Sequence, residues 1–112
     1  MFYSFRQNNS GGSFDVDSSV AQFVIIEAND SSEANARAQE IGIYFDGVDN
    51  GSDCECCGDR WYPADDFDGT ETPMIYRDTA ESYIPMVNFI PSGEPLVHVY
   101  YLNGEQKTYL AK

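Results

Sequence analysis

An apolar run that leads directly into a helix start signal is the feature that most constrains the fold of this chain. Gln22–Asn29 (QFVIIEAN) is nearly continuous in apolar residues, which is typical of a central strand covered on both faces. Asp30 then suits the N-cap of a helix, with Glu33 at the third helical position of a capping box. Apolar or small residues recur at helical spacing as far as Ile41, and Gly42 is a natural residue to end the helix. We therefore expect a buried strand followed by a helix over about residues 31–41.

The two ends of the chain carry hairpin patterns. Residues 2–6 and 13–17 alternate apolar and polar side chains around an asparagine- and glycine-rich turn, which predicts an N-terminal β-hairpin. Residues 96–102 and 105–110 flank Asn103-Gly104, a sequence typical of a two-residue type I′ turn. Such a turn would place His98 opposite Tyr109.

Weaker strand signals lie between these ends, at residues 43–45 and 74–76, and a proline-bounded segment at 84–90 suits an edge strand or extended chain. Together the elements predict one α+β domain over residues 1–112. Its sheet is expected to be mostly antiparallel, with one main helix packed on one face and a long, acidic, cysteine-containing loop.

Charge is the strongest global property. Nineteen acidic residues against six basic ones give a formal net charge of −13, a field that repels nucleic acid and anionic membranes and attracts basic protein surfaces or cations. The acids concentrate in residues 46–71, where Arg60 is the one basic residue. This segment is either a solvated loop or an acidic surface that imitates nucleic acid and docks on a basic protein. The candidate protein-binding residues are Asp59, Asp65, Asp66, Asp68 and Glu71.

The three cysteines lie together in the stretch 53–62 (DCECCGDRWY). Cys54 and Cys57 have the CxxC spacing that lets two thiolates reach one tetrahedral zinc ion, and Cys56 and His98 are candidates for the remaining ligands. A single CxxC is half of an ordinary structural zinc site, so inert reduced thiols and a Cys54–Cys57 redox pair stay open. An odd number of cysteines in a cluster favours a reducing, cytoplasmic compartment over a disulfide framework. No segment is long and apolar enough to span a membrane.

A small-ligand site is the alternative function. Arg6, Arg60 and Trp61 have the chemistry to hold an anionic nucleotide, with arginine on phosphate and an aromatic ring on the base. A glycine-rich loop can turn backbone N–H groups toward the same anion, and its residues are Asn8, Asn9, Ser10, Gly11 and Gly12. An enzyme is less supported, because the chain has one histidine and no nucleophile motif or acid–base pair.

Three strings of the chain, YSFRQNNSGGSF, the block IEANDSSEANARAQEIGIYFDG and CECCGDRWY, cover most of residues 3–62. They resemble a family of small acidic proteins encoded by tailed bacteriophages. The resemblance implies a viral protein made in the cytoplasm of an infected bacterium. In that setting the resemblance implies a small acidic protein that binds host factors, including defence systems. It implies no catalytic residues.

Overall fold

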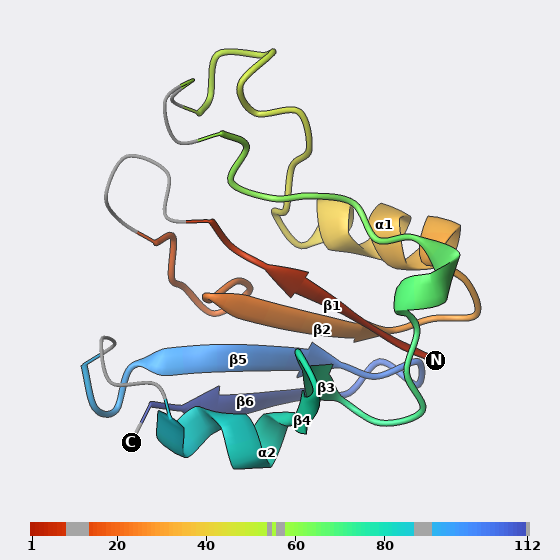
Figure 1. Cartoon of the computed structure of the whole chain (residues 1–112), viewed down its shortest axis with the longest axis vertical. Coiled ribbons are helices and arrows are strands. Elements are labelled where there is room, and N and C mark those ends of the chain that lie inside the picture. Colours follow the sequence, from red (N-terminus) through yellow and green to blue (C-terminus); the bar gives the residue numbers. More distant parts are fainter. Residues whose placement is uncertain (9–13, 54, 56–57, 87–90, 112) are drawn as a thin grey trace.

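A sheet forms the centre of the computed structural model, which describes residues 1–8, 14–53, 55, 58–86 and 91–111. Within these residues the sheet has four strands in the order β1-β2-β5-β6 (Figure 1). The strands are β1 (Phe2–Arg6), β2 (Phe23–Glu27), β5 (Pro95–Tyr100) and β6 (Gln106–Leu110). β2 pairs antiparallel with β1 and parallel with β5, and β6 pairs antiparallel with β5. The predicted α+β fold with a mostly antiparallel sheet is confirmed.

The predicted strand–helix unit is present as β2 and α1 (Ser31–Glu40). Asp30 caps the helix by accepting the Glu33 N–H at 2.8 Å. At the other end Gly42, with φ of 110°, donates to Gln39 O at 3.3 Å, and Ile43 donates to Ala38 O at 3.0 Å. These two bonds form a Schellman motif, which satisfies the last helical carbonyls and buries Ile43. Residues 43–45 therefore close the helix and form no strand, contrary to the prediction.

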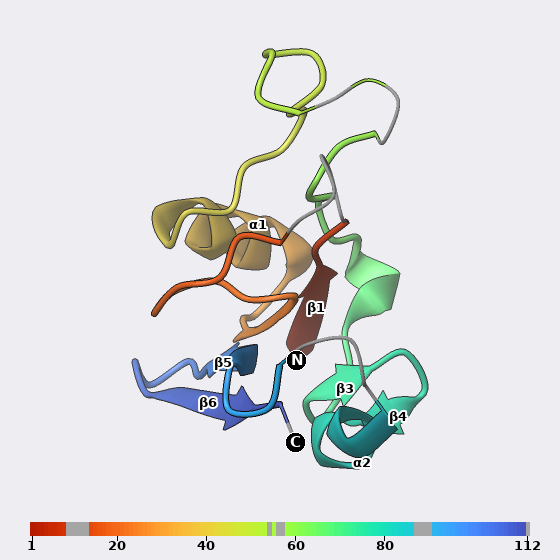
Figure 2. The same cartoon turned by 90° about the vertical axis from the view of Figure 1, so that its left-hand side faces the viewer.

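Helix α1 packs on one face of the sheet, and a smaller layer covers the other face (Figure 2). It consists of the two-stranded pair β3 (Met74–Ile75) and β4 (Asp78–Thr79), the short helix α2 (Ala80–Tyr83) and the 3-10 helix η3 (Ile84–Met86). The strand predicted at 74–76 is thus confirmed in β3. The extended segment predicted at 84–90 is wrong for residues 84–86, which are helical because Thr79 starts a helical turn; residues 87–90 lie outside the described residues.

The sheet has an apolar core on each face, one beneath α1 and one beneath the smaller layer that contains α2. Alternate residues of β2 point to opposite faces, so Phe23 and Ile25 join the core under α2, whereas Val24 and Ile26 join the core under α1. All four are at most 2% exposed. Burying a side chain of this size stabilises the fold by about 1.5–3 kcal/mol. The prediction of a strand covered on both faces is confirmed.

The predicted N-terminal hairpin between residues 2–6 and 13–17 is wrong, because β1 pairs with β2. β2 offers two apolar faces to bury, whereas residues 14–17 carry two aspartates and leave Val16 38% exposed. Gln7 instead holds this segment: its side-chain amide donates to Asp15 O at 3.0 Å and accepts the Asp15 N–H. Hydrogen bonds from the Gln7 side chain thus take the place of the strand pairing that the alternating sequence predicted for this segment.

The C-terminal hairpin is present, but its turn and register differ from the prediction. Tyr101 O accepts the Gly104 N–H at 3.0 Å, and the Tyr101 N–H donates to Glu105 O at 2.8 Å. Gly104 has a positive φ (95°) and Asn103 does not, as in a type I turn followed by a glycine bulge. The pairing is shifted by one residue, so His98 lies opposite Thr108 rather than Tyr109. Tyr109 therefore packs on the core, and Leu110 is 50% exposed.

Candidate functional site

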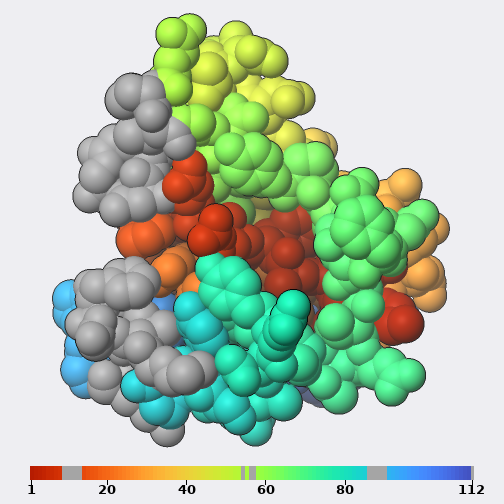
Figure 3. All heavy atoms as spheres, in the orientation of Figure 1, coloured from red at the N-terminus to blue at the C-terminus, as the bar shows by residue number. Residues whose placement is uncertain are grey.

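A cleft of about 320 Å³ lies beside β1, at the outer edge of the sheet. Residues of β1 form its floor. The chain at 62–70 forms one side and β3 with Tyr76 forms the other, so that the space-filling view is hollowed over β1 (Figure 3). The lining residues are Ser4, Arg6, Phe23, Tyr62, Pro63, Ala64, Asp68, Thr70, Met74, Ile75 and Tyr76.

The cleft exists because the chain that runs beside β1 pairs with it at both ends and not in the middle. At one end Phe2 and Thr70 exchange backbone hydrogen bonds of 2.7 and 2.9 Å. At the other end the Asn8 N–H donates to Arg60 O at 2.7 Å. Alternate residues of a strand direct their backbone groups to the same side, so the backbones of Ser4 and Arg6 face the gap. Among the described residues, neither backbone has a partner on that side.

Asn35 of α1 holds the middle of this passing chain away from β1. Its side-chain amide donates to Ala64 O at 3.0 Å, and its carbonyl oxygen accepts the Ala64 N–H at 2.8 Å. Both backbone groups of Ala64 are therefore satisfied by the helix rather than by the sheet. The Asn35 side chain thus contributes to the interruption of the sheet edge.

The rim of the cleft combines aromatic rings with one arginine. Arg6 donates to the Tyr76 hydroxyl at 2.8 Å, and its guanidinium carbon lies 5.8 Å from the centre of the Tyr76 ring. Tyr76 occupies the left-handed region (φ 58°), which is uncommon for a non-glycine residue, and it is 59% exposed. Tyr62 is 55% exposed at the opposite wall. The cleft thus offers apolar walls, two accessible rings and backbone groups that have no partner among the described residues.

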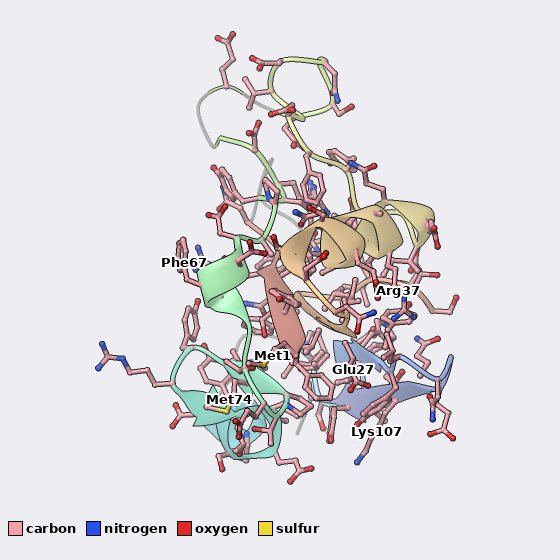
Figure 4. The ribbon with its side chains drawn as sticks, turned by 90° about the vertical axis from the view of Figure 1, so that its right-hand side faces the viewer. Met1, Glu27, Arg37, Phe67, Met74 and Lys107 are labelled. Carbon is pink, nitrogen blue, oxygen red and sulfur yellow. The ribbon has the colours of Figure 1, made fainter. Side chains whose placement is uncertain are left out.

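A short acidic helix lies beside the cleft. The 3-10 helix η2 (Asp66–Asp68) projects Phe67 away from the molecule, where its side chain is 85% exposed (Figure 4). Asp66 accepts the Ser31 N–H at 3.2 Å and the Ser31 hydroxyl at 2.6 Å, which docks η2 on the start of α1. These hydrogen bonds hold the pKa of Asp66 below its usual range. Asp65 and Asp68 are exposed on either side of Phe67.

Four of the predicted protein-binding residues lie on or near this helix, and one does not. Asp65, Asp66 and Asp68 belong to η2 or its cap, and Glu71 follows it on the surface. Asp59 is half-buried and accepts the Val48 N–H at 2.9 Å, so it holds the loop that extends beyond α1.

Arg60 belongs to a buried polar network rather than to an open site. Its guanidinium donates to Gln7 Oε1 at 2.7 Å and to the Tyr44 hydroxyl at 3.2 Å, and its Nε lies 3.7 Å from Asp53 Oδ1. Asp53 also accepts the Arg60 N–H and the Tyr44 hydroxyl, each at 2.8 Å. Burial, with a contribution from the hydrogen bond to Asp53, raises the pKa of Tyr44. A Cβ at Gly47 would lie 1.8 Å from Asp53 Oδ2, so this network requires glycine there.

The predicted nucleotide-binding residues are only partly brought together. Asn8 and Arg60 are hydrogen-bonded neighbours, but Arg6 points into the cleft with Ser4 while the Gln7 side chain joins the Arg60 network. Trp61 is 1% exposed within the core under α1, so its ring has no open face for a ligand. Residues 9–12 of the predicted loop lie outside the described residues.

The predicted zinc ligands are placed only in part. Cys54, Cys56 and Cys57 lie outside the described residues. His98 is 2% exposed, and both ring nitrogens are in hydrogen-bond contact at 2.8 Å, Nδ1 with the Thr108 hydroxyl and Nε2 with Asp17 O. In the part of the chain that the structure describes, no group of three or more His, Cys, Asp or Glu side chains is arranged to hold a metal ion. None of the helices in these described residues has the length and hydrophobicity of a transmembrane segment.

Sequence reasoning missed Tyr76 and Asn35. An asparagine in the middle of a predicted helix is a local signal, because its amide competes with helical hydrogen bonding and often serves a neighbouring backbone instead. Nothing in the sequence indicates that this backbone is Ala64, which lies 29 residues further along the chain.

Comparison with known proteins assigns a family but no activity. Over residues 1–112 the chain matches the family described as a domain of unknown function (DUF7296), and it belongs to that family. No curated protein and no solved structure matches the chain.

Proposed function

We propose that this DUF7296 domain is a protein-binding module whose acidic surface holds a basic region of a partner. The distribution of charge carries the proposal. Fifteen of the nineteen acidic residues are exposed. In contrast, Arg60 is buried, and Arg37 is half-buried and donates to Glu27 O at 2.8 Å and to Tyr101 O at 3.3 Å (Figure 4). Among the described residues, the fifteen exposed acids therefore face only three exposed bases, Arg6, Arg77 and Lys107, and the surface is strongly anionic.

The contact surface that we propose is centred on η2 and consists of Asp65, Phe67, Asp68 and Glu71. Phe67 is the most exposed large apolar side chain among the described residues, at 85%, and aromatic anchors surrounded by polar groups are typical of binding hot spots. Covering Phe67 contributes up to about 1.5–3 kcal/mol of hydrophobic free energy. The flanking carboxylates select a basic partner and accelerate its approach.

The partner class follows from this chemistry. A dense row of carboxylates imitates the phosphates of nucleic acid, so the nucleic-acid-binding face of a protein is a suitable target. If the chain acts in an infected bacterium, as its resemblance to phage proteins implies, that target is a host protein such as a defence factor.

Charge reversal at the proposed surface tests this function. The immobilised domain is used to capture proteins from a bacterial lysate, and the partner is then purified and its affinity measured at low and raised salt. We expect affinity to fall steeply with salt, and Asp65→Lys with Glu71→Lys to reduce it at least tenfold. Glu40→Lys with Glu94→Lys changes the net charge equally, at the far end of α1 and before β5, and should have little effect. Equal affinity for the two double variants would refute the proposal.

The nucleotide alternative is separated by thermal denaturation. A nucleotide at one hundred times its Kd stabilises a folded domain by about 2.7 kcal/mol, which is a readily measured shift in Tm. Because Arg60 and Trp61 are buried in the protein interior, we expect no shift in Tm with mononucleotides or cyclic nucleotides. A clear shift would favour ligand capture over protein binding.

A further inference from the structure

The structure also points to how a partner is held. We propose, on the basis of the protein-binding function above, that the cleft beside β1 receives an extended basic segment of the partner. That segment pairs with the backbone of Ser4 and Arg6 and completes the interrupted edge of the sheet. Strand addition of this kind gains affinity from main-chain hydrogen bonds and specificity from pockets for alternate side chains.

The open length of β1 limits the size of the segment. The chain's own pairing occupies the edge at Phe2 and at Asn8, and these residues are about 20 Å apart at the usual rise of a strand. Ser4 and Arg6 are the residues between them that face the cleft. The gap therefore accommodates a segment of about three to five residues, which offers its N–H and C=O groups to those two backbones.

The walls of the cleft define the side chains that fit. Pro63 and Met74 supply accessible apolar surface, and the rings of Tyr62 and Tyr76 are accessible at the rim. Because alternate residues of a strand point the same way, every second residue of the segment is expected to be apolar and to lie against these walls.

Charge complementarity indicates that the remaining residues are basic. Asp68 lines the cleft, and Asp65 lies beside it at the start of η2. Arg6 is the cation among the lining residues, and its guanidinium is directed at the hydroxyl and ring of Tyr76. A basic residue of the segment thus belongs near Asp68, at the Thr70 end, and a neutral one near Arg6.

The chain's own passing segment is a poor occupant of this edge. Closing the gap with residues 62–66 would break both hydrogen bonds between Asn35 and Ala64. It would also withdraw Asp66 from the Ser31 N–H at the start of α1. An incoming strand satisfies Ser4 and Arg6 without these losses, which favours a separate segment as the partner of β1.

A short designed peptide tests the assignment. Acetyl-Lys-Val-Lys-Val-Ser-amide, which carries a neutral residue at one end, is titrated to millimolar concentration into the ¹⁵N-labelled full chain, and the backbone amide signals are followed. We expect the amides of Ser4 and Arg6 to shift most. N-methylation of alternate peptide amides should abolish binding for the set that faces β1 and spare the other set, because only one set donates to a neighbouring strand. Replacing the lysines with glutamates should weaken binding at least tenfold.

Two protein variants at one position complete the test. Ser4→Pro removes the outward N–H and should abolish the shift of the Arg6 amide. Ser4→Thr keeps both the N–H and a hydroxyl to donate to Met74 O, and should retain that shift; circular dichroism verifies that both variants fold. No shift at Ser4 and Arg6 would overturn the inference. So would shifts confined to residues 65–68 that persist in Ser4→Pro, although that result would leave the proposed acidic surface standing. Failure of the charge-reversal experiment above would instead remove the proposed function itself.

Discussion

Replacement of Arg60 by alanine tests whether this residue is a structural clamp or a ligand-binding group. The guanidinium lies against Asp53, whose side chain is 1% exposed, and against Asp15, whose side chain is 58% exposed. Removing one member of a buried ion pair leaves the other charge unpaired, at a cost of about 3–5 kcal/mol. Asp53 keeps the Tyr44 hydroxyl and the backbone N–H at residue 60, so we expect the lower end of that range.

Urea denaturation at pH 7, followed by circular dichroism, measures this loss. A decrease of about 3 kcal/mol in the free energy of unfolding corresponds to a fall in Tm of about 12 °C for a domain of this size. Arg77→Ala is the matched control, because Arg77 is exposed and has no partner among the described residues; its effect should stay within about 0.5 kcal/mol. If Arg60→Ala costs no more than the control, the network does not bear on stability and our reasoning about Arg60 is wrong.

Three further predictions concern single contacts. Asn35→Ala leaves both backbone groups of Ala64 unsatisfied and should lower the free energy of unfolding by about 1–3 kcal/mol. The control Gln39→Ala, on the exposed surface of α1, should not lower it, and equal losses in the two variants would contradict the role of Asn35. Because Ser31 lowers the pKa of Asp66, their contact stabilises above the ordinary aspartate pKa of about 3.9 and is lost as the pH falls through the lowered value. The difference in free energy of unfolding between wild type and Asp66→Asn should therefore be largest near neutral pH and should disappear in acid. A difference that does not change with pH would contradict this role of the Asp66–Ser31 contact. His98→Leu should cost about 1–3 kcal/mol by leaving Asp17 O and Thr108 without the ring. If the cysteines bind zinc, metal analysis under reducing conditions should find the same zinc content in His98→Leu as in wild type and less zinc in Cys57→Ser. A lower zinc content in His98→Leu would contradict the hydrogen-bonded position of His98.

The sequence predicts the local structure of this chain best where neighbouring residues determine it. The Asp30 cap, the glycine that ends α1 and the two-sided burial of β2 all follow from short-range patterns, and all are present. The failures involve choices among distant partners. Residues 13–17 alternate like a strand, but β1 gains more by pairing with the apolar strand at 23–27.

The site is harder to foresee for the same reason. Asn103-Gly104 is compatible with more than one turn, and a one-residue difference in loop length moves the side chains of β6 to the opposite faces. The cleft beside β1 depends on the contact of Asn35 with Ala64 and on the return of Thr70 to Phe2, 68 residues away. Composition predicted an acidic surface, but the position of Phe67 at its centre comes from the fold.

Amide hydrogen exchange of the free protein tests the central structural claim, the open edge of β1, most directly. Tyr3 and Phe5 direct their N–H groups toward β2, and we predict strong protection for both. Ser4 and Arg6 direct theirs toward the cleft, and we predict exchange at least a hundred times faster. Equal protection of all four amides would show that the edge is already occupied and would contradict the account.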